Sequence, residues 1–180
     1  MTLHDLALAV GNSGVGAWMR SNLHAMPVVE ATHVLAAATV LGTVLVVDLR
    51  LLGFTDRKRA VTVVSREMLG FTWAGFVLAV ITGVMMFAAN ANTYYGNTAF
   101  RIKLLLLAAA GLNMAIFNLG ALRSVVQWDL QQRTPRAARV AAALSVLLWV
   151  SVIFVARWIG FTKGYDFAVP DNVDLDLTIP

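Results

Sequence analysis

The sequence predicts an all-α integral membrane protein, an antiparallel four-helix bundle with a short N-terminal interfacial helix. Three observations indicate this class. Hydrophobic residues make up 59% of the 180-residue chain and charged residues only 13%, whereas soluble domains hold about 25% charged residues. Four apolar stretches are long enough to cross a bilayer, which takes roughly 20 residues of helix. Short polar segments separate these stretches and hold most of the basic residues.

The N-terminal segment, residues 1–26, precedes the first long apolar stretch. Its apolar run LALAV is short, has no basic start, and is followed by glycines and polar residues. We therefore expect neither a membrane span nor a cleavable signal peptide here. Trp18 and Arg20 are residue types found at the headgroup level, which predicts that the segment lies at the membrane interface.

The transmembrane bundle is predicted within residues 27–161. Polar or charged residues bound each apolar stretch, and the short connections between successive spans require neighbouring helices to run antiparallel. The four predicted spans are about 27–52, 68–89, 100–122 and 138–161. Residues 162–180 hold four aspartates and no apolar stretch, which predicts an acidic tail outside the membrane.

A stripe of small residues runs along the second predicted span, at Gly75, Ala79 and Gly83. Small residues at this spacing allow a neighbouring helix to approach closely in lipid. The same smooth face would also admit a flat cofactor. We interpret the stripe as a helix-packing surface.

The basic residues predict the orientation of the bundle. Nine of them lie in or beside the first and third connections: Arg50, Arg57, Lys58, Arg59, Arg66, Arg123, Arg133, Arg136 and Arg139. By the positive-inside rule these connections face the cytoplasm. In a bacterium the protein would then lie in the inner membrane with both termini in the periplasm. The net charge of +4 thus reflects topology, and we expect no nucleic-acid partner.

Ionisable residues inside a span are costly and mark functional sites. Glu30 and His33 are three residues apart, so they share one face of the first span, about one turn into the membrane. The span assignments place further cations in the same outer layer. The layer therefore gathers an imidazole, a carboxylate and three cations: His33, Glu30, Arg101, Lys103 and Arg157.

A haem b site is the leading hypothesis for this layer. His33 would be the axial ligand, since neutral imidazole commonly holds haem iron. The three cations would neutralise the haem propionates, and Glu30 would orient His33 or handle protons. The protein would be an electron-transfer subunit that exchanges electrons with quinone or with a periplasmic partner, because a histidine–carboxylate pair can take and pass protons.

The second axial ligand is an open question at this point. His24 and His33 are nine residues apart, which in a continuous helix is half a turn out of phase and about 13 Å along the axis. They could share one iron only if Pro27 breaks the helix. Otherwise another subunit would supply the ligand, the iron would be five-coordinate, or a methionine would serve: Met85, Met86 or Met114.

Other chemistries and roles stay open. His24 and Met26, with His33 or Glu30, offer imidazole and thioether ligands that suit copper. In a non-catalytic scaffold subunit of a homo-oligomer or larger membrane complex, His33 would be a hydrogen-bonded packing residue. The absence of cysteine excludes disulfides, thiolate metal sites and covalent c-type haem. No nucleotide-binding, hydrolase or zinc-protease motif occurs, so no catalytic residues are assigned.

The residues Pro27-Val-Val-Glu30-Ala-Thr-His33 and Asp48-Leu-Arg50-Leu-Leu-Gly53 resemble a known family. This is the group of bacterial four-helix membrane proteins described only as a domain of unknown function. The likeness continues at Gly75-Phe76, Asn97-Thr-Ala-Phe100-Arg101-Ile-Lys103, Ala110-Gly111-Leu112-Asn113 and Arg157-Trp158-Ile159-Gly160, and covers roughly residues 20–161. The resemblance implies an inner-membrane four-helix fold; the haem-binding role comes from the residues and not from the family.

Overall fold

The computed structural model describes residues 2–55, 59–119, 125, 129 and 134–162. Helices account for nearly all of this part of the chain, and it contains no strand. They are α1 (Leu3–Gly11), α2 (Gly14–Ser21), α3 (Ala25–Leu52), α4 (Val61–Ala89), α5 (Ala91–Gly96), α6 (Thr98–Leu119) and α8 (Arg136–Thr162). The long apolar helices α3, α4, α6 and α8 can each cross a bilayer, with mean hydropathies of 1.7 to 2.2. The predicted fold class is confirmed, and the chain is a multi-pass membrane protein.

Some predicted features lie outside the described residues. These are the acidic tail beyond Thr162, residues 120–122 of the third predicted span, and four of the basic residues used for orientation: Arg57, Lys58, Arg123 and Arg133.

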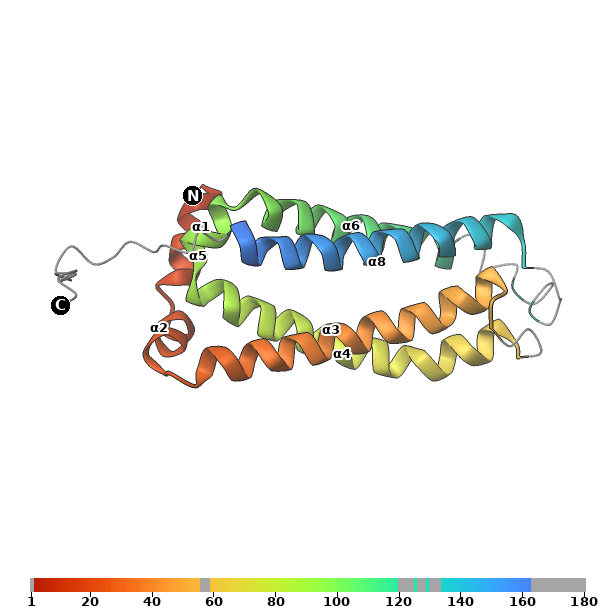
Figure 1. Cartoon of the computed structure of the whole chain (residues 1–180), viewed down its shortest axis with the longest axis horizontal. Coiled ribbons are helices and arrows are strands. Elements are labelled where there is room, and N and C mark those ends of the chain that lie inside the picture. Colours follow the sequence, from red (N-terminus) through yellow and green to blue (C-terminus); the bar gives the residue numbers. More distant parts are fainter. Residues whose placement is uncertain (1, 56–58, 120–124, 126–128, 130–133, 163–180) are drawn as a thin grey trace, which may run out of the picture.

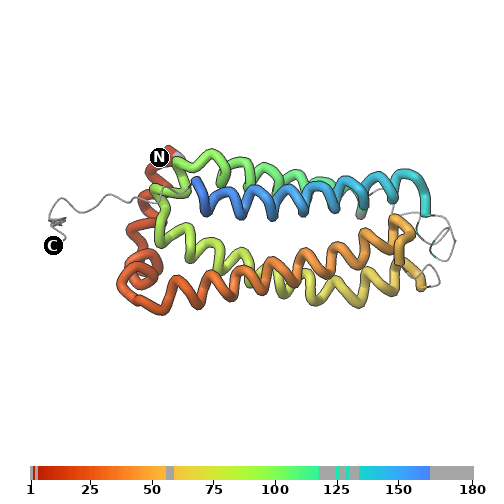
Figure 2. The backbone as a smooth tube through the Cα atoms, in the orientation of Figure 1, coloured from red at the N-terminus to blue at the C-terminus, as the bar shows by residue number. Residues whose placement is uncertain are grey.

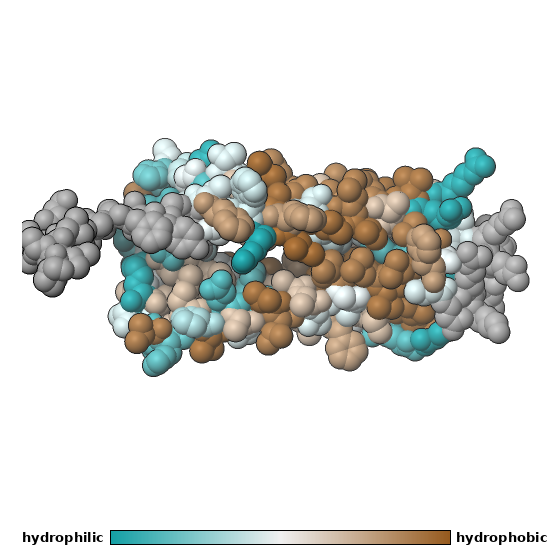
Figure 3. Space-filling model, viewed as in Figure 1, coloured by the Kyte–Doolittle hydropathy of each residue, from teal (hydrophilic) through white to brown (hydrophobic). Residues whose placement is uncertain are grey.

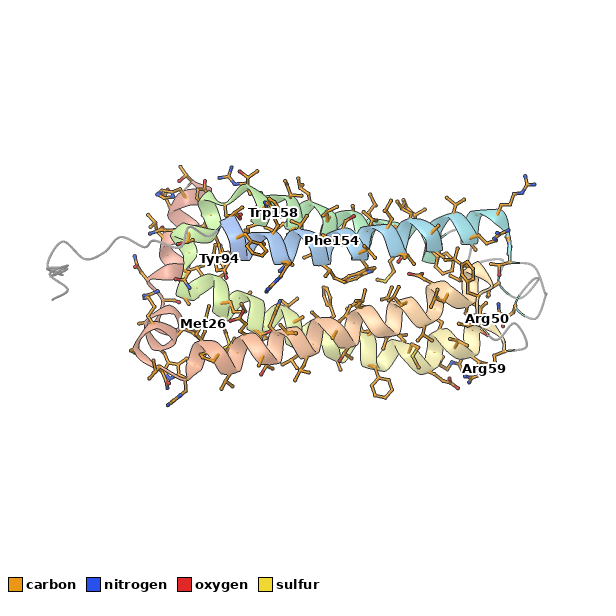
Figure 4. The ribbon with its side chains drawn as sticks, in the orientation of Figure 1. Met26, Arg50, Arg59, Tyr94, Phe154 and Trp158 are labelled. Carbon is orange, nitrogen blue, oxygen red and sulfur yellow. The ribbon has the colours of Figure 1, made fainter. Side chains whose placement is uncertain are left out.

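The four long helices form two pairs (Figures 1 and 2). α3 packs along α4, α6 packs along α8, and the pairs meet where α3 contacts α8. Arg50 and Arg59 lie at one end of the bundle, and Met26 and Tyr94 lie at the other (Figure 4). We call these the Arg59 end and the α1 end. α3 and α8 are close at the Arg59 end and diverge toward the α1 end (Figure 1).

A buried apolar cluster joins both helix pairs at the Arg59 end. Its fully packed members are Leu51, Val61, Val125, Ala138 and Ala142. Next to it, the Asp129 carboxylate accepts hydrogen bonds from the Thr62 backbone N–H, at 3.0 Å, and from the Thr62 hydroxyl. This carboxylate caps the first turn of α4, where backbone N–H groups lack helical partners. The negatively charged Asp129, in the third connection, therefore stabilises the N-terminus of α4.

α4 begins at Val61, ahead of the predicted start at residue 68. The prediction followed apolarity, which marks only the segment that lies in hydrocarbon. The helix itself continues through Ser65, Arg66 and Glu67, because its backbone hydrogen bonds do not depend on apolar side chains.

The N-terminal segment forms two helices, α1 and α2, that lie across the α1 end (Figure 1). Arg20 on α2 fastens them to the bundle. Its guanidinium donates to the carbonyls of Ala88 and Ala89 at the end of α4, at 3.1 and 3.3 Å, and to the carbonyl of Gly11 at 2.9 Å. Carbonyls at helix C-termini lack helical donors and attract cations, so one side chain closes both helix ends.

The small-residue stripe is the contact between α3 and α4. A Cβ placed on Gly75 would lie 3.1 Å from the Ala36 carbonyl oxygen and 3.1 Å from Val40 Cγ2. Only glycine lets the two backbones approach so closely. The helix-packing interpretation of the stripe is confirmed.

The α1 end holds a second apolar cluster that ties α4 and α5 to the other helix pair. It centres on Tyr94, Ala99 and Ile159, with Phe87, Phe100 and Val155 packed against it. Between this cluster and the one at the Arg59 end, the molecular surface is hollowed where the two helix pairs diverge (Figure 3). The bundle is therefore packed at both ends and open between them.

Candidate functional site

His33 lies in the interface between α3 and α4, eight residues after the start of α3, which is about 12 Å along the helix axis. Its Nδ1 lies 2.9 Å from the Thr82 hydroxyl oxygen on α4. Thr82 is buried and His33 is half-buried. His33 and Thr82 therefore form a hydrogen bond between two membrane-spanning helices. Polar side chains within a membrane need such partners.

The hydrogen bonds of Thr82 favour one tautomer of His33. The Thr82 hydroxyl has a single proton, which it donates to the Leu78 carbonyl oxygen at 2.7 Å. With its proton directed to Leu78, the hydroxyl oxygen accepts from Nδ1 of His33, which in this arrangement carries the hydrogen. In this tautomer Nε2 is the nitrogen with a lone pair, and the ring also hydrogen-bonds to the Ala79 backbone on α4.

Gly83 provides the surface on which this ring rests. A Cβ at Gly83 would lie 3.3 Å from His33 Cε1, so a larger residue would press on the imidazole. Glu30, from the same helix, and Lys103, from α6, both lie within electrostatic range of the ring. The structure thus brings together three of the predicted site residues, from both helix pairs.

The other two predicted cations make their contacts elsewhere. Arg101 is exposed and donates from Nε and Nη2 to the Tyr95 carbonyl oxygen, at 3.1 and 2.9 Å. Arg157 is exposed and its guanidinium lies 5.7 Å from the centre of the Phe161 ring. Both lie at the α1 end, but neither contacts His33. The five residues of the predicted layer thus lie toward the same end of the bundle, and the contacts of Arg101 and Arg157 are not with His33.

The predicted metal ligand His24 is not brought to His33. It is exposed and is the N-cap residue of α3, which continues without a break through Pro27 to Leu52. The two histidines therefore keep the separation of about 13 Å expected for a continuous helix. Met26, Met85 and Met86 pack instead against the apolar cluster of Met19, Ala25, Val29 and Ala89. Within the described residues, no three His, Asp or Glu side chains are grouped for metal binding.

The Arg59 end contains two further buried ionisable residues, Asp48 and Arg50, close to the end of α3. Asp48 is 6% exposed and Arg50 is 3% exposed. Nε of Arg50 donates to the Arg59 carbonyl oxygen at 2.8 Å. The available signal was their position before the end of an apolar stretch, where an ionisable residue must find protein partners.

A family model matches residues 21–162, which includes all four long helices. The chain belongs to this family, whose description is "Family of unknown function (DUF6644)". The resemblance noted from the sequence is confirmed. No curated protein and no solved structure matches the chain.

Proposed function

We propose that this member of the family is a membrane electron-transfer subunit that binds haem b, with His33 as an axial ligand. The observation that carries the proposal is the hydrogen bond from His33 Nδ1 to Thr82. Histidines that bind metals donate their second ring N–H to a fixed acceptor, which sets the tautomer and orients the ring. The His33–Thr82 pair has this arrangement, in a protein that has no thiolate ligand to offer.

Two further features support a haem group at this place. The two helix pairs diverge toward the α1 end, where α3 begins (Figure 1), and the surface is hollowed between the packed ends (Figure 3), as a flat macrocycle requires. Lys103 supplies a cation from the helix pair opposite to His33, which suits a propionate. Arg101 uses Nε and Nη2 to donate to the Tyr95 carbonyl oxygen. Its Nη1 can therefore also bind an anion at the α1 end. Arg157 would join it from α8.

The distribution of charge supports an orientation. Arg50, Arg59, Arg66, Arg136 and Arg139 all belong to the Arg59 end. By the positive-inside rule that end faces the cytoplasm. The His33 site would then lie near the outer surface, which in a bacterium is the periplasmic side of the inner membrane. Electrons would pass to or from quinone or a periplasmic partner, and Glu30, which is exposed beside His33, would exchange protons.

The described residues offer no second axial ligand at the depth of His33. Met114 lies 16 residues after the start of α6, about 24 Å along that helix, which is roughly twice the depth of His33. We therefore expect a five-coordinate iron in the monomer. A second copy of the chain would provide a sixth ligand.

Haemin titration of the purified protein in detergent tests the proposal. We expect a Soret band that shifts on reduction with dithionite, and its loss in His33→Ala. His24→Ala is the matched control, since it removes an exposed imidazole from the same helix and should leave the spectrum unchanged. Wild-type protein that shows no Soret band after haemin is added, or His33→Ala with an unchanged band, would contradict the proposal.

A second candidate function is a scaffold subunit of a homo-oligomer or of a larger membrane complex. The apolar window of α6 favours it, because only 6% of that window is buried within the chain, compared with 28% for α3. In this case the His33–Thr82 pair would serve packing alone. Native mass spectrometry from nanodiscs distinguishes the two functions: a stable oligomer without bound haem would favour the scaffold.

A further inference from the structure

Asp48 lies on α3 at the junction of the two helix pairs, four residues before the end of the helix. It is 6% exposed. Its Oδ2 is the one buried side-chain oxygen or nitrogen in the described part of the chain that has no hydrogen-bond partner. Buried polar atoms are nearly always paired, so this oxygen requires an explanation.

The neighbour of Asp48 across the junction is neutral. The Ser145 hydroxyl on α8 hydrogen-bonds to the carboxyl group. This contact joins α3 to α8 beside the apolar cluster of Leu51 and Ala142, at the point from which the helix pairs diverge. A hydroxyl can stabilise a carboxyl group, but it does not neutralise a negative charge.

The charged groups on the surrounding elements are directed elsewhere. Arg50, two residues along α3, points to a different side of the helix and donates to the Arg59 carbonyl oxygen. On α4, Glu67 pairs with the Arg59 side chain at 2.6 Å, and Arg66 is exposed. On α8, Arg136 and Arg139 are exposed, and Asp129 in the third connection accepts from Thr62. No described cation therefore lies against the Asp48 carboxyl group.

An ionised carboxylate in such a place is costly. A buried charge without a counter-ion loses far more free energy than a buried neutral polar group, and it takes up a proton or draws in water instead. A hard metal cation is a poor solution, because Ca²⁺ takes six to eight oxygen ligands and Mg²⁺ six. The described residues around Asp48 supply one carboxylate and one hydroxyl.

We propose that Asp48 is a proton-binding site at the junction of the two helix pairs, and that its Oδ2 carries a proton in the folded protein at neutral pH. The neutral acid lets α3 and α8 stay in contact through Ser145. Loss of the proton places a charge in the junction and admits water, so the helix pairs separate at the Arg59 end. This site is independent of any group bound at His33.

Infrared spectroscopy of the full-length protein tests the proposal directly. At about pH 7, solvated aspartates, with an ordinary pKa of about 3.9, are ionised. We expect wild-type protein to show the C=O stretching band of a protonated carboxylic acid. Carboxyl-labelled ¹³C-aspartate should move this band, and Asp48→Asn should abolish it. Asp129→Asn is the matched control and should keep it.

Ser145→Ala provides a variant that retains the carboxyl group. The band should persist in this protein at a shifted frequency, because the hydrogen bond from the hydroxyl is lost. Absence of a protonated-acid band from wild-type protein at neutral pH overturns the proposal. A band that moves with ¹³C-aspartate and survives Asp48→Asn also overturns it.

The pH dependence of unfolding gives a second readout. Above about pH 4 the unfolded chain has lost the Asp48 proton that the folded chain keeps, so the folded state binds more protons and stability falls as pH rises. Asp48→Asn should remove the part of the fall in stability with rising pH that Asp48 causes, while Asp129→Asn should retain it. Equal profiles for wild type and Asp48→Asn contradict the proposal. Stabilisation by Na⁺ over choline that requires Asp48 would assign the site to a cation instead and overturn it.

Discussion

Nδ1 of His33 on α3 and the hydroxyl oxygen of Thr82 on α4 lie 2.9 Å apart, within the apolar part of two membrane-spanning helices. The hydroxyl proton is engaged by the Leu78 carbonyl, so the imidazole is the donor. This interhelical hydrogen bond therefore favours the tautomer whose lone pair lies on Nε2. The orientation and the chemistry of His33 both depend on a residue 49 positions away in the sequence.

Thr82→Val should loosen this histidine. Valine removes the acceptor for Nδ1–H at similar volume, and we expect a loss of about 1 kcal/mol in stability, a typical value for a polar contact between membrane helices. If His33 binds haem, affinity should fall about 10- to 100-fold, as found when the partner of a metal-binding histidine is removed. Haemin titration and thermal unfolding in detergent measure these effects. Thr82→Ser keeps the hydroxyl and should behave like wild type; equal haem affinity in Thr82→Val and wild type would exclude this role for Thr82.

Gly75→Ala should separate α3 from α4. The added methyl group would meet the Ala36 carbonyl and Val40 at 3.1 Å, so we expect a loss of about 1–3 kcal/mol from overpacking. Gly70→Ala on the same helix is the control, because nothing lies within 4 Å of its Cβ position. The free energy of unfolding in mixed detergent micelles measures both variants. If the two changes cost the same, the close helix contact at Gly75 is not what requires glycine.

Arg20→Met should release α1 and α2 from the end of the bundle. The change removes the donors to the carbonyls of Gly11, Ala88 and Ala89. Hydrogen bonds from a charged donor contribute about 1.5–3 kcal/mol, and every 1.4 kcal/mol is tenfold in an equilibrium. Amide hydrogen exchange in residues 3–21 should therefore accelerate about tenfold or more. The exposed Arg139 provides the control: Arg139→Met should leave exchange in this segment unchanged, and equal acceleration in both variants would contradict the capping role.

The depth of each polar residue in the membrane could be predicted from the sequence, but not its lateral neighbours. The position of His33 along its span follows from counting residues at a fixed rise per residue. Its partner does not, because Thr82 meets His33 only when one particular face of α4 packs on α3. The same limit applies to Arg101, which the sequence predicted in one layer with His33 and whose guanidinium donates to the Tyr95 carbonyl oxygen in the structure.

The burial of Asp48 could likewise not be predicted from the sequence. Its place near the end of a span was visible, and nothing in the stretch Asp48-Leu-Arg50 distinguishes a residue that faces headgroups from one enclosed by protein. Burial arises because α8 crosses α3 at this level and brings Ser145 to the carboxyl group. The environment of Asp48 is therefore determined by α8, a helix far from it in the sequence.

Four apolar helices, and the position of each ionisable side chain along its helix, could be predicted from the amino-acid sequence alone. Both follow from the free energy of transferring side chains from water into hydrocarbon. This free energy is a sum over the residues of a segment, so it can be calculated from the sequence. Which side chains meet, such as His33 with Thr82 and Asp48 with Ser145, emerged from the packing of the helices. The reason is that the rotation of each helix about its axis depends on how its surface fits its neighbours, and close fit at residues such as Gly75 cannot be read from one helix alone.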